Sequence, residues 1–233
     1  LNIPYVGVDH MAAHILSAFL EEKKPTFPYI ALIVSGGTTA LFRARSFYEF
    51  DLLGRTRDDA AGEAFDKVAR LLGLGYPGGP VVSSRAAGAD SAHVQLPRAW
   101  LKDSHDFSFS GLKTAVLNHC NSTRSKNLEV DIDATCASFE EAVVEVLVEK
   151  TITAARATKT ETIVIGGGVS ANTRLRESLR NRCAEEQLAL YLPAPENCTD
   201  NGAMIAFSGI KNYEKGIRGS LEDDVFSRSH LGL

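Results

Sequence analysis

Residues 29–44, YIALIVSGGTTALFRA, join a continuous apolar run to a second strand-like run through a Ser-Gly-Gly turn. A short apolar run that ends in glycine is typical of a buried strand leading into a turn. We therefore expect strands over residues 29–34 and 39–44, with a third over residues 49–54. Three such runs in succession predict an antiparallel meander.

Helix-like and strand-like segments alternate along the rest of the chain. Apolar residues recur at helical spacing in residues 62–72, 134–157, 171–186 and about 199–213. Short strand-like runs occupy residues 3–8, 161–165 and 189–192, whereas the polar, uneven residues 120–133 suggest an exposed connection. The alternation, without an internal repeat, predicts an α/β fold.

The composition of the 233 residues is that of a folded globular protein, with 44% hydrophobic and 23% charged residues. The net charge of −4 argues against a nucleic-acid binder that depends on charge alone, but allows an enzyme that meets RNA through a local patch or a partner. No run approaches about 18 apolar residues, so we expect no membrane helix. The four cysteines lack a Cys-x-x-Cys pair, and reduced thiols in a cytosolic protein are expected.

Three glycine-rich turns are candidates for binding a nucleotide. Ser35-Gly36-Gly37 joins two expected strands, and GGGVSAN (166–172) joins a strand to a helix. Glycines let backbone N–H groups approach an anion, and a helix N-terminus favours negative charge. Each turn also serves as an ordinary hairpin or crossover, and neither matches a Walker A or dinucleotide motif. YPGGP (76–80) either walls a pocket or caps a helix.

His10 and His14 are spaced so that both imidazoles lie on one face of an expected helix. Such a pair suits a metal ion, and also occurs as a structural or surface feature. Asp200, expected in the first turn of the last helix, is the candidate third ligand; helix capping is its alternative role. The other histidines are expected at the surface: His93, His105, His119 and His230.

An acidic cluster surrounds the start of the helix expected over residues 62–72. Acids at a helix N-terminus are usually favourable partners of the helix dipole, and we expect this role for Asp58, Asp59 and Glu63. Asp66 lies one turn inside the helix, where it can face a cleft.

Seven segments match, in order, the motifs of one family. They are HMAAH (10–14), VSGGTT (34–39), DDAAGEAFDK (58–67), YPGGP (76–80), DFSFSGLKT (106–114), GGGVSAN (166–172) and CTDNGAM (198–204). Over nearly its whole length the chain resembles the TsaD-type tRNA N6-adenosine threonylcarbamoyltransferases. The resemblance implies an actin/hexokinase/Hsp70-like (ASKHA) ATPase fold, with two lobes around a nucleotide cleft.

Against this family the C-terminal lobe looks essentially complete and the N-terminal lobe truncated, because the family's earlier phosphate loop and first strands have no counterpart in the sequence. We expect residues 1–28 to be a remnant of the N-terminal lobe that carries the His pair. Residues 29–233 are then the C-terminal nucleotide-binding lobe, with a helical insertion and a returning C-terminal helix. Residues 1–233 alone are expected to be an inactive fragment.

The resemblance also implies a reaction, the transfer of threonylcarbamoyl from threonylcarbamoyl-adenylate to N6 of the adenosine next to the anticodon in tRNA. By the motif match, His10, His14 and Asp200 hold one divalent metal, iron or zinc. The adenylate, or ATP or ADP, then lies in the cleft against the matching residues Ile33, Val34, Ser35, Gly36, Gly37, Asp66, Gly79 and Asn172. The implied partners are tRNA and, in a bacterium, a TsaB-type paralogue and a TsaE-type ATPase, all in the cytoplasm. The sequence names no catalytic acid or base.

Thr38 departs from the family pattern, which usually has histidine at this point of the Ser-Gly-Gly turn. The exchange can weaken substrate positioning or phosphate contact, so a catalytically weak member that acts as a scaffold or binding subunit is an alternative. A sugar kinase or other ATPase of the same fold is another, although it has no use for the His pair. A zinc peptidase ranks last, because Met11 stands where its motif needs glutamate.

Overall fold

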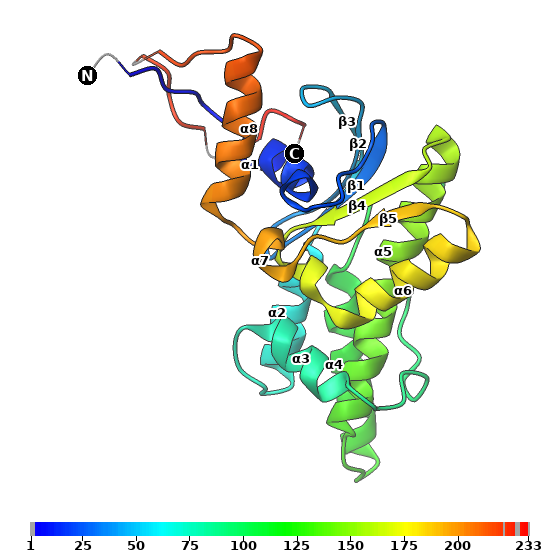
Figure 1. Cartoon of the computed structure of the whole chain (residues 1–233). Coiled ribbons are helices and arrows are strands. Elements are labelled where there is room, and N and C mark those ends of the chain that lie inside the picture. The colour runs from blue at the N-terminus through cyan, green and yellow to red at the C-terminus, as the bar shows by residue number, and fades with distance from the viewer. Residues whose placement is uncertain (1–2, 221, 227–228, 233) are drawn as a thin grey trace.

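The computed structural model describes residues 3–220, 222–226 and 229–232, and its centre is a five-stranded mixed sheet (Figure 1). The strands are β1 (Tyr29–Val34), β2 (Thr39–Ala44), β3 (Phe50–Arg55), β4 (Thr162–Gly166) and β5 (Ala189–Tyr191). Their order is β3-β2-β1-β4-β5. The first three strands form the expected antiparallel meander, whereas β4 runs parallel to both β1 and β5.

Strand β1 is the middle strand, and every one of its residues is buried. Its side chains alternate between two cores: Ile30, Leu32 and Val34 belong to one, and Ala31 and Ile33 belong to the other. A strand covered on both faces needs apolar residues at successive positions. This requirement explains why residues 29–34 form a continuous apolar run instead of an alternating one.

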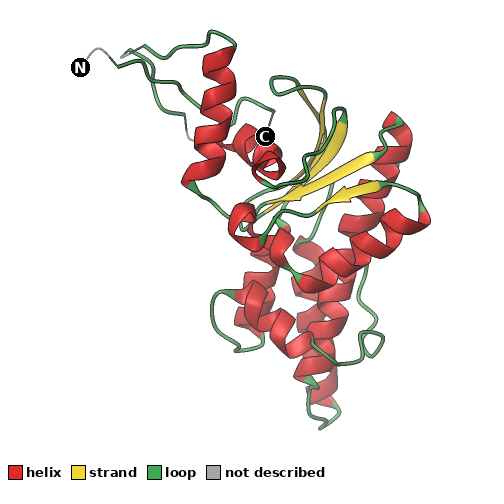
Figure 2. Cartoon of the chain, in the orientation of Figure 1, coloured by secondary structure: helices red, strands yellow, loops and turns green. Residues whose placement is uncertain are grey.

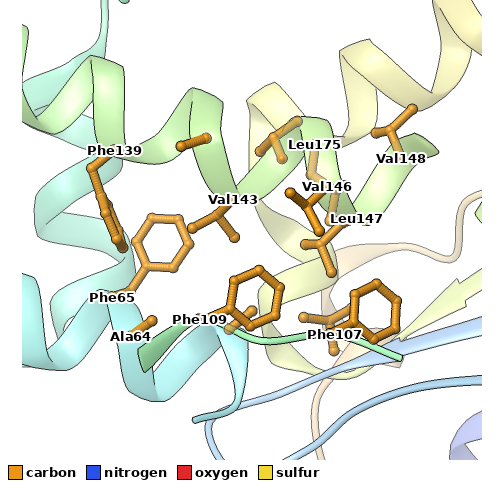
Figure 3. Packing of buried hydrophobic residues seen from close by; sticks show 14 of the residues in the cluster. Ala64, Phe65, Phe107, Phe109, Phe139, Val143, Val146, Leu147, Val148 and Leu175 are labelled. Carbon is orange, nitrogen blue, oxygen red and sulfur yellow. The ribbon is translucent and has the colours of Figure 1, made fainter. Parts of the chain in front are cut away.

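Five helices and a short 3₁₀ turn cover the first face of the sheet or extend beyond it (Figure 2). They are α2 (Ala61–Leu71), α3 (Gly78–Ala86), α4 (Ser110–Ser125), α5 (Ile132–Thr158), η2 (Gly168–Ala171) and α6 (Thr173–Glu185). The larger core lies among them, with the rings of Phe65 and Phe139 meeting edge to face at 5.1 Å (Figure 3). Phe107 and Phe109 close this core from the segment that leads into α4.

The opposite face is covered by elements that lie near the two ends of the chain. They are α1 (His10–Leu16), η1 (Ser17–Leu20), the one-turn α7 (Pro195–Cys198) and α8 (Gly202–Glu214). Aromatic rings join them, because Phe19 stacks on Phe27 at 5.3 Å and on Phe207 of α8 at 5.8 Å. Since α1 packs on β1 and β4 and also against α8, the first and last helices lie side by side (Figure 1). The division of the chain at residue 28 stays a prediction.

The structure confirms the α/β class and corrects three expectations about elements. Residues 3–8 form no strand: they are largely exposed, and among the described residues one backbone hydrogen bond, from the Gly219 N–H to the Tyr5 carbonyl, ties them to the distant chain. Helices α3 and α4 were not expected, and residues 120–125 are the end of α4, not part of a connection. In the described part of the chain, no helix has the length and apolar character of a membrane span.

Candidate functional site

Helix α1 presents the two histidines because Asp9 fixes its first turn. Oδ1 of Asp9 accepts hydrogen bonds from the N–H groups of Met11 at 2.9 Å and Ala12 at 3.1 Å, which caps the helix. His10 and His14 then follow one turn apart on the same face, with ring centroids 4.7 Å apart. The spacing seen in the sequence thus places two imidazoles side by side.

Asp200 faces this pair from the connection between α7 and α8. Its Oδ1 lies 3.2 Å from Nε2 of His10 and 2.9 Å from Nε2 of His14, and the three ligand atoms lie within 4.8 Å of one another. Asp200 is not in the first turn of α8, as the sequence suggested, because Asn201 is the cap and accepts the Met204 N–H at 2.9 Å. Capping is therefore done by the neighbouring residue, and the carboxylate of Asp200 is directed to the histidines.

One of the three side chains is buried and the other two are open to solvent, an arrangement that suits a metal ion at the protein surface. The side chain of His14 is 3% exposed, whereas those of His10 and Asp200 are 50% and 78% exposed. Burial, and then the proximity of His10, lower the pKa of His14 despite the opposing effect of Asp200, so its imidazole is neutral at pH 7. In the described part of the chain, the buried Nδ1 of His14 has no hydrogen-bond partner. Two imidazole nitrogens and one carboxylate oxygen are a donor set that fits zinc or ferrous iron.

The three residues open into a cavity of about 1140 Å³. The turn that follows β1 forms one wall, and Ser35, Gly36, Gly37 and Thr38 line the cavity. The C-terminal segment forms another wall through Asp223, Asp224, Val225, Phe226, Ser229 and His230. Asp9 holds this segment, because its carboxylate accepts hydrogen bonds from the Ser229 hydroxyl at 2.8 Å and the His230 N–H at 3.0 Å. His230 is exposed, as expected, but its place in the cavity wall was not visible in the sequence.

The turn at residues 35–38 is held by its own backbone. The Ser35 N–H donates to the Thr38 carbonyl at 2.7 Å, and the Thr38 N–H donates to the Ser35 hydroxyl at 3.0 Å. Within the described residues, the N–H groups of Gly36 and Gly37 are used by no hydrogen bond, so both can face an anion. The bonds at position 38 come from its backbone, so threonine in place of histidine keeps the turn and changes only the side chain that faces the cavity.

A second cavity of about 440 Å³ adjoins the first, and Gly36 lines both. It brings together four residues implied by the family resemblance: Gly36, Asp66, Gly79 and Asn172. Tyr76, which is 80% exposed, lies on its rim, and Gly168 and Val169 contribute the second glycine turn. Ile33 and Val34 line neither cavity, because both side chains are buried inside β1.

Asp66 and Asn172 shape the second cavity through internal hydrogen bonds. Oδ1 of Asp66 accepts the Gly78 N–H at 2.7 Å, which fixes the start of α3. Oδ1 of Asn172 caps α6 by accepting the Leu175 N–H at 2.8 Å, while its Nδ2 donates to Ser83 at 2.8 Å and to Glu140 at 2.6 Å. The Asn172 amide is thus engaged within the protein, and its place against the adenylate stays a prediction.

Glu140 is a residue of this region that sequence reasoning missed. Its side chain lies in α5, is 7% exposed, and accepts from both Ser83 and Asn172. A charged residue on a helix face that is otherwise apolar was the available signal, since buried carboxylates need partners.

The remaining acids near α2 are structural. Asp58 accepts hydrogen bonds from the backbone and hydroxyl groups at the start of α4, including the Phe109 N–H at 2.8 Å. Asp59 and Glu63 both pair with Lys67. The motif DFSFSGLKT therefore supplies the hydroxyl and N–H groups that donate to the Asp58 carboxylate at the start of α4. Its Ser108 lies 50 residues after Asp58.

Comparison with known sequences gives one family. A family model described as tRNA N6-adenosine threonylcarbamoyltransferase matches residues 1–207. A protein of that name from Desulfotalea psychrophila is 54% identical to the chain, over 99% of this chain and 68% of that protein. Another from Syntrophus aciditrophicus is 48% identical over 100% of this chain and 68% of its own length.

Among solved structures, full-length HypF in a phosphate- and nucleotide-bound form superposes with a TM-score of 0.69 over 97% of this chain and 45% of that one, at 16% identity. HypF from T. kodakarensis gives a TM-score of 0.68 over 92% of this chain and 38% of that one, at 14% identity. At such identities the likeness concerns the fold alone. It confirms the actin/hexokinase/Hsp70-like architecture expected from the motifs.

Proposed function

Because the chain belongs to the tRNA N6-adenosine threonylcarbamoyltransferase family, we propose that it transfers a threonylcarbamoyl group from threonylcarbamoyl-adenylate to N6 of the adenosine next to the anticodon in tRNA. The observation that carries the proposal is the junction of the two cavities at Gly36. One cavity has glycine turns suited to a nucleotide, and the other has the His10, His14 and Asp200 cluster.

The adenylate matches this arrangement because it has a nucleotide at one end and an acyl group at the other. With the nucleotide in the smaller cavity, the phosphate lies at the junction, where the N–H groups of Gly36 and Gly37 can donate to it. The bond between the carbamoyl carbon and the phosphate oxygen breaks as the bond from N6 to that carbon forms. AMP leaves with the electron pair, and the proton that N6 loses goes to water.

The side chains of the larger cavity have the properties that this transfer requires. His14 is held neutral and buried, so its ring has a fixed position, and Asp200 and His10 are open to the cavity. An iron or zinc ion held by these residues supplies a Lewis acid that can polarise the carbamoyl group or bind the threonyl part. Asp9 keeps both histidines in place by capping α1.

The proposal includes partners that the chain itself does not contain. They are tRNA and, in a bacterium, a TsaB-type paralogue and a TsaE-type ATPase, together with an enzyme that makes the adenylate. The proposed substrate places the reaction in the cytoplasm. The net charge of −4 gives the chain no general attraction to RNA. Contact with tRNA is therefore expected through a local patch or through a partner protein.

The test is modification of tRNA by the full-length protein with its complete partner set, whereas residues 1–233 alone are expected to give no product. Digestion of the tRNA and mass spectrometry of the nucleosides read the product directly. Wild-type protein is expected to give the threonylcarbamoylated adenosine, and the double variant His10→Ala, His14→Ala is expected to give none. His93→Ala is the matched control, because His93 is exposed and lines neither cavity.

Two outcomes contradict different parts of the proposal. Modification at the wild-type level by the double variant refutes the role of the histidine cluster. No product from the full-length wild-type protein with all partners present refutes the transferase function and favours a binding subunit.

A further inference from the structure

The side chain of Arg176, in the second turn of α6, joins two segments that are far apart in the sequence. Its Nε donates to the Ser170 carbonyl at 2.7 Å, and its Nη2 donates to the Pro193 carbonyl at 2.6 Å. The same Nη2 lies 3.3 Å from Sγ of Cys198. One guanidinium thus bridges three groups, which its planar, forked set of donors makes possible.

The segments that Arg176 joins belong to the two cavities. Ser170 lies in η2, next to Gly168 and Val169 of the smaller cavity. Pro193 and Cys198 lie in the segment that leads to Asp200, the carboxylate of the His-Asp cluster. Cys198 is fully buried and lies two residues before Asp200. Arg176 therefore holds the chain close to that carboxylate.

Further contacts make the bridge stiff. Helix α7, at the start of the Asp200 segment, packs directly against η2, the 3₁₀ turn that contains Gly168 and Ser170. On the other side, Oε1 of Glu21 accepts hydrogen bonds from the Ala194 N–H and the Asn197 side chain, both at 2.8 Å. Glu21 directly follows η1, which continues from the helix of His10 and His14. The Asp200 segment is therefore tied to the histidines by Glu21 and to the glycine turn by Arg176.

We propose that Arg176 is a positioning residue that couples the metal cluster to the nucleotide cavity, so that occupation of either site tightens the other. The inference rests on the proposed function, because it assumes a metal at His10, His14 and Asp200 and an adenylate at the glycine turns. A nucleotide that orders the turn at residues 166–169 holds the Ser170 carbonyl, and Arg176 passes this constraint to the Asp200 segment. Coupling between two binding equilibria is reciprocal, so a bound metal tightens the nucleotide by the same factor.

The experiment is a titration of the full, metal-free chain with Co²⁺, followed by visible absorption, without and with saturating AMP. Wild-type protein is expected to bind Co²⁺ about 5- to 150-fold more tightly when AMP is present, the usual range for coupled sites. Arg176→Gln is expected to bind both ligands with the coupling reduced to less than about 2-fold, because a glutamine amide cannot hold both carbonyls. Arg176→Lys is expected to lose the coupling as well, because it keeps the charge but not the forked donors.

Arg180→Gln is the matched control, since Arg180 is exposed one turn further along α6, and it should keep the wild-type coupling. Full coupling in either Arg176 variant overturns the inference, and so does wild-type protein that binds both ligands without mutual effect. The latter result leaves the proposed function standing. Wild-type protein that binds no Co²⁺ refutes the metal cluster itself, and the coupling with it.

Discussion

Nε2 of His14 lies 2.9 Å from Oδ1 of Asp200, although 186 residues separate them in the sequence. The two side chains meet because α1 and α8 pack against each other on one face of the sheet. The cluster that includes His10 is therefore complete only when the two ends of the described chain are folded together.

Asp200→Asn should remove the anionic ligand with almost no change of size. We expect the affinity for Co²⁺ or Zn²⁺ to fall by at least about 100-fold, because even the outer partners of a metal ligand contribute about 10- to 100-fold. Equilibrium dialysis with metal analysis measures the change. Asp224→Asn removes a carboxylate from the same cavity but outside the cluster, and an equal loss in both variants would show that the cavity acts only through its total charge.

The sheet was predictable from the sequence because its signal is local. Residues 29–34 and 39–44 are each rich in apolar residues, which predicts buried strands, and the structure has strands with these bounds. Helix α3 was missed because it begins with Gly-Gly-Pro, which by itself favours a turn. Its start is fixed by Asp66, which accepts the Gly78 N–H, a contact between segments that no local pattern contains.

The candidate site was predictable only where residue type and spacing are sufficient. The i, i+4 spacing brought His10 and His14 together, as expected. The partners of Asn172 were not predictable, because its side chain meets Ser83 and Glu140 from two other helices. Bridging by Arg176 is likewise a property of the fold, since its acceptors are carbonyl groups that every residue carries.

Gly62→Ala should push α2 away from the turn at residues 35–38. The added Cβ would lie 2.6 Å from the Ser35 carbonyl oxygen and 2.8 Å from Cα of Gly36, and neither backbone atom can move aside freely. We expect a loss of about 1–3 kcal/mol in the free energy of unfolding, as for other overpacked sites, together with weaker AMP binding. Urea unfolding and calorimetry measure the two effects.

Gly111→Ala is the control for this substitution. Gly111 is exposed in α4 with nothing within 4 Å of an added Cβ, so alanine should stabilise the protein by about 0.5–1 kcal/mol. If Gly62→Ala behaves in the same way as Gly111→Ala, the close approach of α2 to the turn is not a constraint in solution.

Asp9→Ala should weaken both the start of α1 and the cavity wall that Asp9 holds through Ser229 and His230. We expect a loss of about 1–2 kcal/mol in stability, the usual cost of a lost N-cap, and weaker Co²⁺ binding because His10 is the first residue of the helix. Asp9→Asn keeps the capping oxygen but replaces the oxygen that accepts the His230 N–H by an amide NH2, so it should keep the start of α1 and lose less stability than Asp9→Ala. Equal losses in the two variants would assign the effect to the oxygen that holds Ser229 and His230, and not to the capping of α1.

Asp106 should make stability depend on pH in a defined direction. Burial would raise the pKa of Asp106, but hydrogen bonds from the Arg55 N–H and the Arg57 side chain outweigh it and hold the pKa below its ordinary value of 3.8. A carboxyl with a lower pKa in the folded state binds fewer protons there than in the unfolded state. Its stabilisation is therefore fully present above about pH 5 and is lost as the pH falls through 4 and below.

Asp106→Asn lacks this ionisation, so its unfolding free energy should lie furthest below that of the wild type at pH 7, by about 1–3 kcal/mol for a buried hydrogen-bonded carboxylate. The difference should shrink as urea unfolding is repeated at pH 5, 4 and 3.5. Glu49→Gln, at an exposed position, should stay within about 0.5 kcal/mol of the wild type throughout. A gap between wild type and Asp106→Asn that is constant from pH 7 to pH 3.5 would mean that packing, and not the ionised carboxylate, accounts for the role of Asp106.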